Sequence, residues 1–275
     1  MKSMKKMLII AIIAIVAVVC VSSVVSAGLF DFLGSSSSSD QLKGQEVNLA
    51  VAASLKNAYD EKLIPMFEKK YPGVKVTPTY ASSGDLQSQI ENGLKADVFM
   101  SASNKQMNNL AKKDLVNNST NVQFLENKVV LVVPNNASTN ISSFEDLNKT
   151  NGIIAIGNPE SVPAGQYAKE VLTSLGIWDS VQSKLSLGTD VTAVLNQVAQ
   201  GSADCGIVYA TDAKSNPNVK VVCEAPNGTL KTPVIYPVAE LKNPEHPEAA
   251  KAFMEFLKTK EAKDVFVEYG FTIHE

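Results

Sequence analysis

The sequence predicts an α/β protein with two lobes, each a mixed or parallel sheet flanked by helices, and a ligand cleft between them. Apolar, strand-like runs alternate with amphipathic helical segments from Glu46 onward. Serine, glycine or proline occupies the turns where a strand gives way to a helix. Such alternation favours parallel sheets covered by helices, whose ligands lie beyond the carboxyl ends of the strands. One large doubly wound sheet remains the alternative architecture.

Periodicity and breaker residues place the individual elements. The first long helix is expected to end before Pro72-Gly73, and the β-branched run from Val129 is suited to a central strand. The expected strands span residues 47–52, 74–80, 96–100, 129–134, 153–156, 206–209, 219–222 and 234–238. The expected helices span residues 55–71, 85–92, 105–112, 167–175, 191–200, 247–258 and 262–269.

Composition shifts divide the chain into four parts. Residues 1–27 are expected to be a signal peptide or a membrane anchor, and residues 28–45, with five consecutive serines, a flexible linker. The folded part has room for two medium domains. We expect one lobe over residues 46–127 plus 236–275 and the other over residues 128–235.

The N-terminus indicates export. Three lysines in the first six residues precede an uncharged, mostly apolar segment from Met7 to Phe30. Val25-Ser26-Ala27 provides a small-residue cleavage site, so a cleaved signal peptide is one interpretation. The uncharged segment is also long enough to span a bilayer, for which about 20 residues suffice, so an uncleaved anchor competes with it. Cys20 follows two valines, which argues against a lipoprotein.

Composition argues against several classes of function. A net charge of −3 and the lack of a basic cluster beyond the N-terminus argue against nucleic-acid binding. Two histidines and no Cys/His cluster make a zinc site, a bare-cation site or a histidine-based triad improbable. Cys205 and Cys223 are interpreted as buried, unpaired thiols in preference to a disulfide. Six sequons leave glycosylation open, at Asn117, Asn118, Asn136, Asn140, Asn148 and Asn227.

Neutral hydrogen-bond donors recur where strands end and helices begin. Ser54 and Ser83 follow the first two strands, although capping alone would account for each serine. Pro163 opens a helix whose next amide, that of Ala164, is uncovered, and the Val191 amide opens another. Tyr209 ends a strand. Such donors, with helix dipoles behind them, suit an anion.

The chain contains no arginine, so an anion site must use amides, hydroxyls or lysine. Converging neutral donors suit a small, fully ionised oxyanion that accepts hydrogen bonds and donates none. Asp85 and Glu160 stand near these donors in the sequence and weaken the argument against a protonated anion.

From about Val47 to Ile273, the chain resembles the molybdate-binding proteins of ABC importers, members of the two-lobed substrate-binding-protein superfamily. The resemblance rests on six stretches in the right order, namely Ala52-Ala53-Ser54-Leu55, Ala81-Ser82-Ser83, Ala96-Asp97-Val98-Phe99-Met100-Ser101-Ala102, Val162-Pro163-Ala164-Gly165-Gln166-Tyr167-Ala168, Gly206-Ile207-Val208-Tyr209 and Tyr269-Gly270-Phe271-Thr272-Ile273. It implies that molybdate is held by five residues: Ser54, Ser83, Ala164, Val191 and Tyr209. Ala164 stands where a related group places a carboxylate ligand, which implies tetrahedral, carboxylate-free binding.

The resemblance further implies a non-enzymatic, exported protein, monomeric and without a cofactor, that delivers molybdate or tungstate to a membrane permease and its ATPase. It would act at the extracellular face of the membrane or in the periplasm, attached to the membrane if the N-terminal segment is uncleaved. Another tetrahedral oxyanion such as sulfate is the alternative ligand. An exported hydrolase using Ser83 and Asp85 is a weaker alternative, because no G-x-S-x-G motif or placed histidine supports it. A cell-surface adhesion protein would leave the gathered helix N-termini unexplained.

Overall fold

The computed structural model describes residues 42–274. The expected signal peptide or anchor, Cys20 and most of the expected linker lie outside the described residues. The described residues from Gly44 onward form one compact unit. Within residues 42–274, no helix is both long and apolar enough to cross a membrane.

The first lobe is built on a six-stranded mixed sheet with the order β11-β4-β10-β3-β1-β2. Strand β1 pairs in parallel with β2 and β3, whereas β10 is antiparallel to β3 and β4. The strand bounds are β1 (Glu46–Ala52), β2 (Lys75–Ala81), β3 (Val98–Met100), β4 (Val122–Asn127), β10 (Val234–Glu240) and β11 (Thr272–Ile273).

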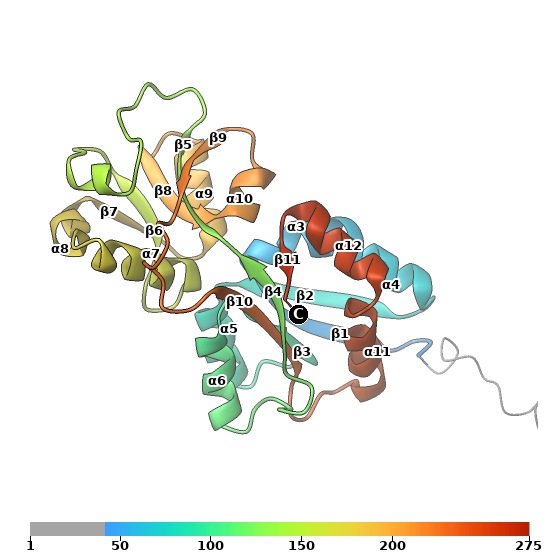
Figure 1. Ribbon diagram of the computed structural model, residues 1–275. Helices are drawn as coiled ribbons and strands as arrows, with labels where there is room; N and C mark the ends of the chain where they lie inside the picture. The colour runs from blue at the N-terminus through green and yellow to red at the C-terminus, as the bar shows by residue number, and fades with distance from the viewer. Residues whose placement is uncertain (1–41, 275) are drawn as a thin grey trace, which may run out of the picture. The chain divides into compact units, whose positions relative to one another are not determined.

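Helices cover both faces of this sheet, with α5 and α6 on one side and α4, α11 and α12 on the other (Figure 1). Leu86 and Met107 of the first pair pack against Ala50, Phe99 and Ala239 of the sheet. The helix bounds are α4 (Ile64–Lys70), α5 (Ser83–Glu91), α6 (Asn104–Lys112), α11 (Pro247–Leu257) and α12 (Lys260–Tyr269). Burial of these apolar faces fixes the positions of the strand ends that carry the polar residues.

The second lobe is built on a five-stranded mixed sheet with the order β7-β6-β8-β5-β9. Strand β6 is parallel to β7 and β8, and β5 is antiparallel to β8 and β9. The strand bounds are β5 (Val129–Pro134), β6 (Ile154–Gly157), β7 (Leu185–Gly188), β8 (Cys205–Tyr209) and β9 (Val219–Glu224). The helix bounds are α7 (Pro163–Ser174), α8 (Trp178–Val181), α9 (Val191–Ala199) and α10 (Ala210–Ser215).

Strand order also decides the state of the two cysteines. Cys205 lies on β8 and Cys223 on β9, and β5 runs between these strands. Both thiols are free. The prediction of unpaired cysteines is therefore confirmed, although Cys223 is only half-buried.

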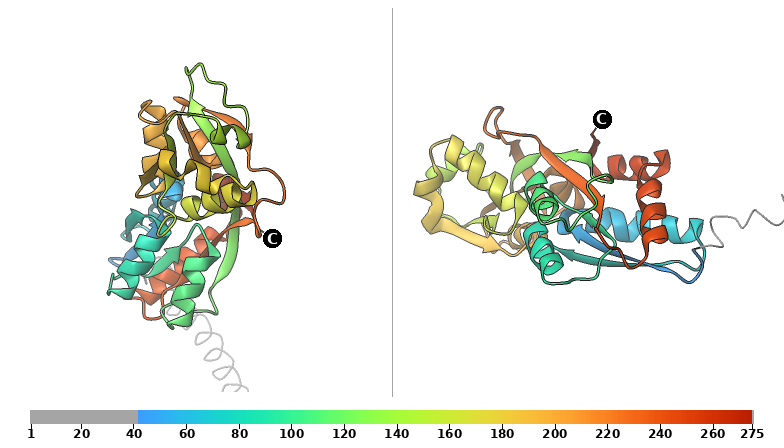
Figure 2. Two further views of the ribbon diagram at one scale, coloured as in Figure 1. Left: turned by 90° about the vertical axis from the view of Figure 1, so that its left-hand side faces the viewer. Right: turned by 90° about the horizontal axis from the view of Figure 1, so that it is seen from below.

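The chain crosses between the sheets at Asn127–Lys128, where β4 leads directly into β5, and again through residues 225–233, which join β9 to β10. In the left view of Figure 2, the green segment that contains β4 and β5 passes from one sheet to the other along one side. Strand β10 begins at Val234, so the lobe boundary expected after residue 235 falls two residues inside a strand of the first lobe.

Several elements differ from expectation. Strands β4, β7 and β11 and helices α8 and α10 were not expected, whereas α7 begins at Pro163, the residue expected to open it, ahead of the periodic segment from Tyr167. The first long helix is divided into a 3₁₀ turn η1 (Ala53–Leu55), α3 (Lys56–Ala58), a π turn η2 (Tyr59–Leu63) and α4. The start of α7 at Pro163 follows from this proline, whose missing N–H and fixed φ suit the first helical position.

Candidate anion-binding site

All five residues singled out from the sequence line one small cavity between the two lobes. Its volume is about 10 Å³, the space of one water-sized sphere. The cavity is lined by Ala52, Ala53, Ser54, Ser82, Ser83, Ala102, Val162, Pro163, Ala164, Asp190, Val191 and Tyr209. A cavity of this size excludes an extended organic molecule.

The first lobe contributes two serines from adjacent parallel strands. Ser54 lies in η1, directly after β1, and Ser83 opens α5, directly after β2. Because β1 and β2 are paired in parallel, their carboxyl ends bring both serines to the same edge. Ser82 caps α5 by accepting a hydrogen bond from the Asp85 amide at 3.1 Å.

The Ser83 side chain is held as a donor. It is 1% exposed, and its Oγ accepts a hydrogen bond from the amide of Ala102 at 2.9 Å. A hydroxyl that accepts from an amide keeps its own proton to donate elsewhere. Ser83 therefore offers an O–H at the cavity wall.

The second lobe contributes two helix N-termini. In α7 the Gln166 amide makes the first bond back along the chain, to the Val162 carbonyl at 3.0 Å. The Ala164 amide precedes this bond and has no acceptor within the helix. In α9 the Asp190 side chain accepts from the Ala193 amide at 2.8 Å. The Val191 amide, at the first position of the helix, comes before this bonded amide in the chain.

A glycine allows α7 to approach the end of β6. A Cβ on Gly165 would lie 1.9 Å from the carbonyl oxygen of Gly157, the last residue of β6. No side chain fits at that separation. This close approach seats the N-terminus of α7 at the cavity.

Tyr209 supplies a buried hydroxyl that lacks a partner. The residue ends β8, is 1% exposed, and its Oη has no hydrogen-bond partner within the described residues. Burial raises the pKa of this phenol well above its ordinary value, so it remains a neutral donor. An unsatisfied buried hydroxyl carries a free-energy cost that a bound acceptor would remove.

The cavity wall carries one charged side chain, that of Asp190, and no lysine. Asp85 and Glu160, which stand close to the donors in the sequence, do not line the cavity. Residues 42–274 contain no group of three or more His, Cys, Asp or Glu side chains placed to hold a metal ion. Neutral donors and helix dipoles therefore dominate the electrostatics of the wall.

Direct contacts hold the two lobes together beside the cavity. The Gly84 amide donates to the Ser161 carbonyl at 2.9 Å, and Gln106 Nε2 donates to Gln166 Oε1 at 3.4 Å. Each bond joins one lobe to the other, and the cavity walls are largely shielded from solvent.

Sequence reasoning missed Tyr236, whose hydroxyl lies 2.9 Å from Ser54 Oγ. Tyr236 lies within the apolar run that forms β10, and nothing in that run distinguishes it from a core aromatic residue. A larger, more open cavity of about 370 Å³ adjoins the connection from β9 to β10, and none of the five predicted site residues lines it.

Comparison with known proteins identifies the family of this chain. Residues 47–272 match the family model described as bacterial extracellular solute-binding protein. The molybdate-binding protein ModA of Escherichia coli (strain K12) is 40% identical over 235 residues, which cover 83% of this chain and 89% of that protein. A putative ABC transporter substrate-binding lipoprotein of Bacillus subtilis (strain 168) is 39% identical over 236 residues, covering 86% of this chain and 90% of that protein.

A solved structure supports the same assignment. The substrate-binding domain of a putative molybdenum ABC transporter from Clostridium difficile superposes with a TM-score of 0.64 at 39% identity, covering 84% of this chain and 100% of that one. The resemblance to molybdate-binding proteins is thereby confirmed, as is the two-lobed fold of two mixed sheets flanked by helices. The chain belongs to the bacterial extracellular solute-binding protein family.

Proposed function

We propose that this protein captures molybdate, and tungstate with it, outside the cytoplasm and delivers the anion to an ABC importer. The observation that carries the proposal is the unpartnered Tyr209 hydroxyl, buried in the wall of a cavity that Ser54, Ser83 and the amides of Ala164 and Val191 also line. These groups can all donate hydrogen bonds and come from both lobes. The names of the relatives support the choice of molybdate among oxyanions.

Binding would proceed by closure of the lobes around the dianion. The open form admits the anion, and rotation about the two crossing segments at 127–128 and 225–233 brings the donors of both lobes onto it. Each charge-assisted hydrogen bond contributes about 1.5–3 kcal/mol. Several together support submicromolar affinity after the cost of ordering and closure.

The donor set also defines the selectivity. A larger tetrahedral anion reaches donors on both walls, whereas the smaller sulfate falls short of some of them. A phosphate that keeps a proton needs an acceptor, and the wall offers it one charged acceptor, the carboxylate of Asp190, whose Oδ1 also accepts from the Ala193 amide. Sulfate remains the second candidate ligand.

The protein would act as the capture subunit of a larger assembly. Its sequence has no G-x-x-x-x-G-K-[ST] motif, so a separate ATPase would drive the permease on which the closed, monomeric form docks. Membership of an extracellular family agrees with export. Attachment to the membrane through the N-terminal segment is part of the proposal if that segment is uncleaved.

Calorimetric titration of the purified protein with molybdate, tungstate and sulfate tests the proposal. We expect tight one-to-one binding of the first two anions and none of sulfate. The double variant Ser83→Ala, Tyr209→Phe should lose most of the affinity for molybdate. No heat with molybdate, or undiminished affinity in the double variant, would refute the proposal. Turnover of a generic ester would instead favour a hydrolase.

A further inference from the structure

A chain of hydrogen bonds, part-buried at Ser54 and buried beyond it, connects Ser54 to the point where the polypeptide crosses between lobes. Ser54 Oγ lies 2.9 Å from Tyr236 Oη, and Asn127 Nδ2 lies 3.2 Å from the same Oη. Asn127 Nδ2 also lies 2.8 Å from Thr211 Oγ1. Tyr236 is fully buried, and Thr211 and Asn127 are 5% and 9% exposed, so water does not compete freely for these groups.

The direction of each bond follows from the Asn127 amide. The Lys128 backbone N–H, which can only donate, bonds to Asn127 Oδ1 at 2.8 Å. That bond identifies Oδ1 as the acceptor, and both hydrogens of Nδ2 then donate, one to Thr211 and one to Tyr236. Tyr236 Oη accepts from Asn127, and its own proton can be donated to Ser54 Oγ, which lies 2.9 Å away.

We propose that Asn127 and Tyr236 are positioning residues that fix the Ser54 hydroxyl as a donor toward the bound oxyanion. This inference rests on the proposed function. Because Ser54 Oγ accepts from Tyr236, its own proton is directed to the cavity. Without this constraint the Ser54 hydroxyl would rotate between two orientations. In one it donates its proton to the anion, and in the other it directs its lone pairs at the anion and repels it.

The same bonds tie the donor to both lobes. Asn127 is the last residue of β4, Tyr236 lies on the neighbouring strand β10, and Thr211 lies on α10 of the other lobe. The orientation of Ser54 is therefore secured by a side chain located where β4 passes into β5.

A double-mutant cycle on molybdate affinity tests the proposal. We expect Ser54→Ala to weaken binding by about tenfold or more and Tyr236→Phe by about fivefold. In the Ser54→Ala background, Tyr236→Phe should change the affinity by less than about twofold, since Tyr236 acts through the hydroxyl already removed. An equal loss in both backgrounds, or no loss from Tyr236→Phe alone, would overturn the proposal.

Tyr59→Phe is the matched control, because Tyr59 is a fully buried tyrosine of the same lobe whose hydroxyl donates to Met100 Sδ at 3.0 Å. It should leave molybdate affinity unchanged. If the wild-type protein binds no molybdate, the proposed function fails. The hydrogen-bond chain is then tested separately, by applying the same double-mutant cycle to the thermal unfolding midpoints of the ligand-free protein. The hydrogen-bond chain is supported if the double variant Ser54→Ala, Tyr236→Phe lowers the midpoint by less than the sum of the two single decreases. Strictly additive decreases contradict it.

Discussion

The backbone of Gly84 meets the backbone of Ser161 across the cleft, with the Gly84 amide donating to the Ser161 carbonyl at 2.9 Å. Gly84 lies in the first turn of α5, and Ser161 lies in the loop that leads to α7. A Cβ placed on Gly84 would stand 2.3 Å from that carbonyl oxygen. Only glycine therefore permits this contact between the lobes.

Gly84→Ala should weaken molybdate binding by at least about tenfold, or about 1.4 kcal/mol, because the added methyl group holds the lobes apart. Alanine is favourable inside a helix, so the ligand-free protein should unfold at an unchanged or slightly higher temperature. Titration calorimetry and thermal unfolding provide the two measurements. Ser88→Ala, on the exposed side of the same helix, is the control. Wild-type affinity in Gly84→Ala would show that closure does not need this contact.

Tyr209→Phe should separate affinity from stability. The Tyr209 hydroxyl has no hydrogen-bond partner among residues 42–274, so its removal relieves a buried, unsatisfied group, and the ligand-free protein should be as stable as wild type or more stable. The same change removes a donor to the anion and should raise the Kd by about tenfold or more. Thermal unfolding with and without molybdate measures both effects. A loss of ligand-free stability would mean that the hydroxyl is satisfied within the protein.

The five candidate site residues were predictable because their signals are local. Ser54, Ser83 and Val191 each follow a strand and open a helix or a 3₁₀ turn, and Ala164 follows a helix-starting proline. Parallel pairing of β1 with β2, and of β6 with β7 and β8, gathers these turns at common sheet edges. The alternation of elements therefore indicates these donor positions within each lobe, and the family resemblance selects the five residues among them.

The hydrogen-bond chain behind Ser54 was not predictable, because its contacts are long-range. Ser54 and Tyr236 are 182 residues apart, and Asn127 and Tyr236 are 109 apart. These residues meet only because β10 pairs antiparallel with β4 after the whole second lobe has intervened. Strand β4 itself, Val122–Asn127, has the mixed sequence VQFLEN, whose alternation is too weak to identify it as a strand.

Asp212 should make stability depend on pH. The pKa of its carboxyl is raised from 3.8 to about 8, because burial and the nearby Asp190 raise it by more than a hydrogen bond from the Tyr209 amide at 3.1 Å lowers it. Between about pH 4 and 8 the folded state holds a proton that the unfolded state has lost. The free energy of unfolding therefore falls as the pH rises through this window.

The isosteric variant Asp212→Asn removes this titration, and its amide oxygen can still accept from the Tyr209 amide. Its thermal midpoint relative to wild type should be higher at pH 8 than at pH 5. Parallel pH profiles for the two proteins would show that Asp212 does not titrate in this range.

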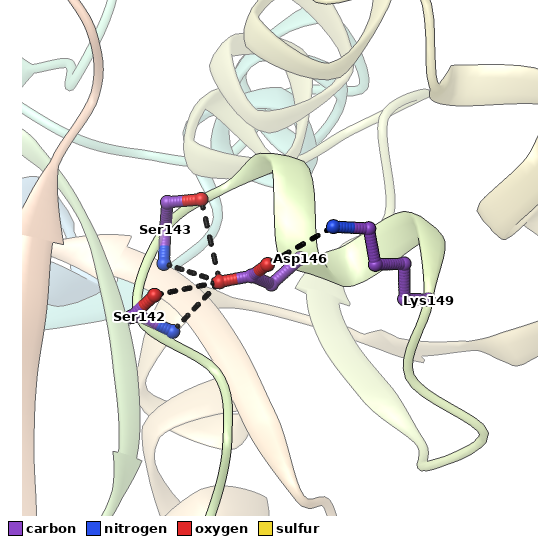
Figure 3. Close-up of polar contacts among 4 residues, drawn as sticks. All are labelled: Ser142, Ser143, Asp146 and Lys149. Carbon is purple, nitrogen blue, oxygen red and sulfur yellow. Dashed lines mark hydrogen bonds and ion pairs between the residues drawn. The ribbon is translucent and has the colours of Figure 1, made fainter.

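Asp146 should make stability depend on pH in the opposite direction. Its Oδ2 accepts from the amide and hydroxyl of Ser142 at 3.0 and 2.8 Å and from those of Ser143 at 3.1 and 3.4 Å, and Lys149 Nζ lies 3.8 Å from its Oδ1 (Figure 3). These donors, with those of Ser142 contributing most, lower the pKa of the carboxyl below 3.8. These hydrogen bonds therefore stabilise the fold at pH values above the ordinary pKa of 3.8, and their contribution is lost as the pH falls through the lowered pKa.

Amide chemical shifts of Ser142 and Ser143, followed by NMR from pH 6 downward, should titrate with a midpoint below 3.8. Ser142→Ala removes one hydroxyl donor, so the Ser143 amide of that variant should titrate at a higher pH than in wild type. An unchanged midpoint in Ser142→Ala would mean that the hydroxyl does not stabilise the carboxylate. The lowered pKa would then have to be assigned to the backbone amides and to Lys149.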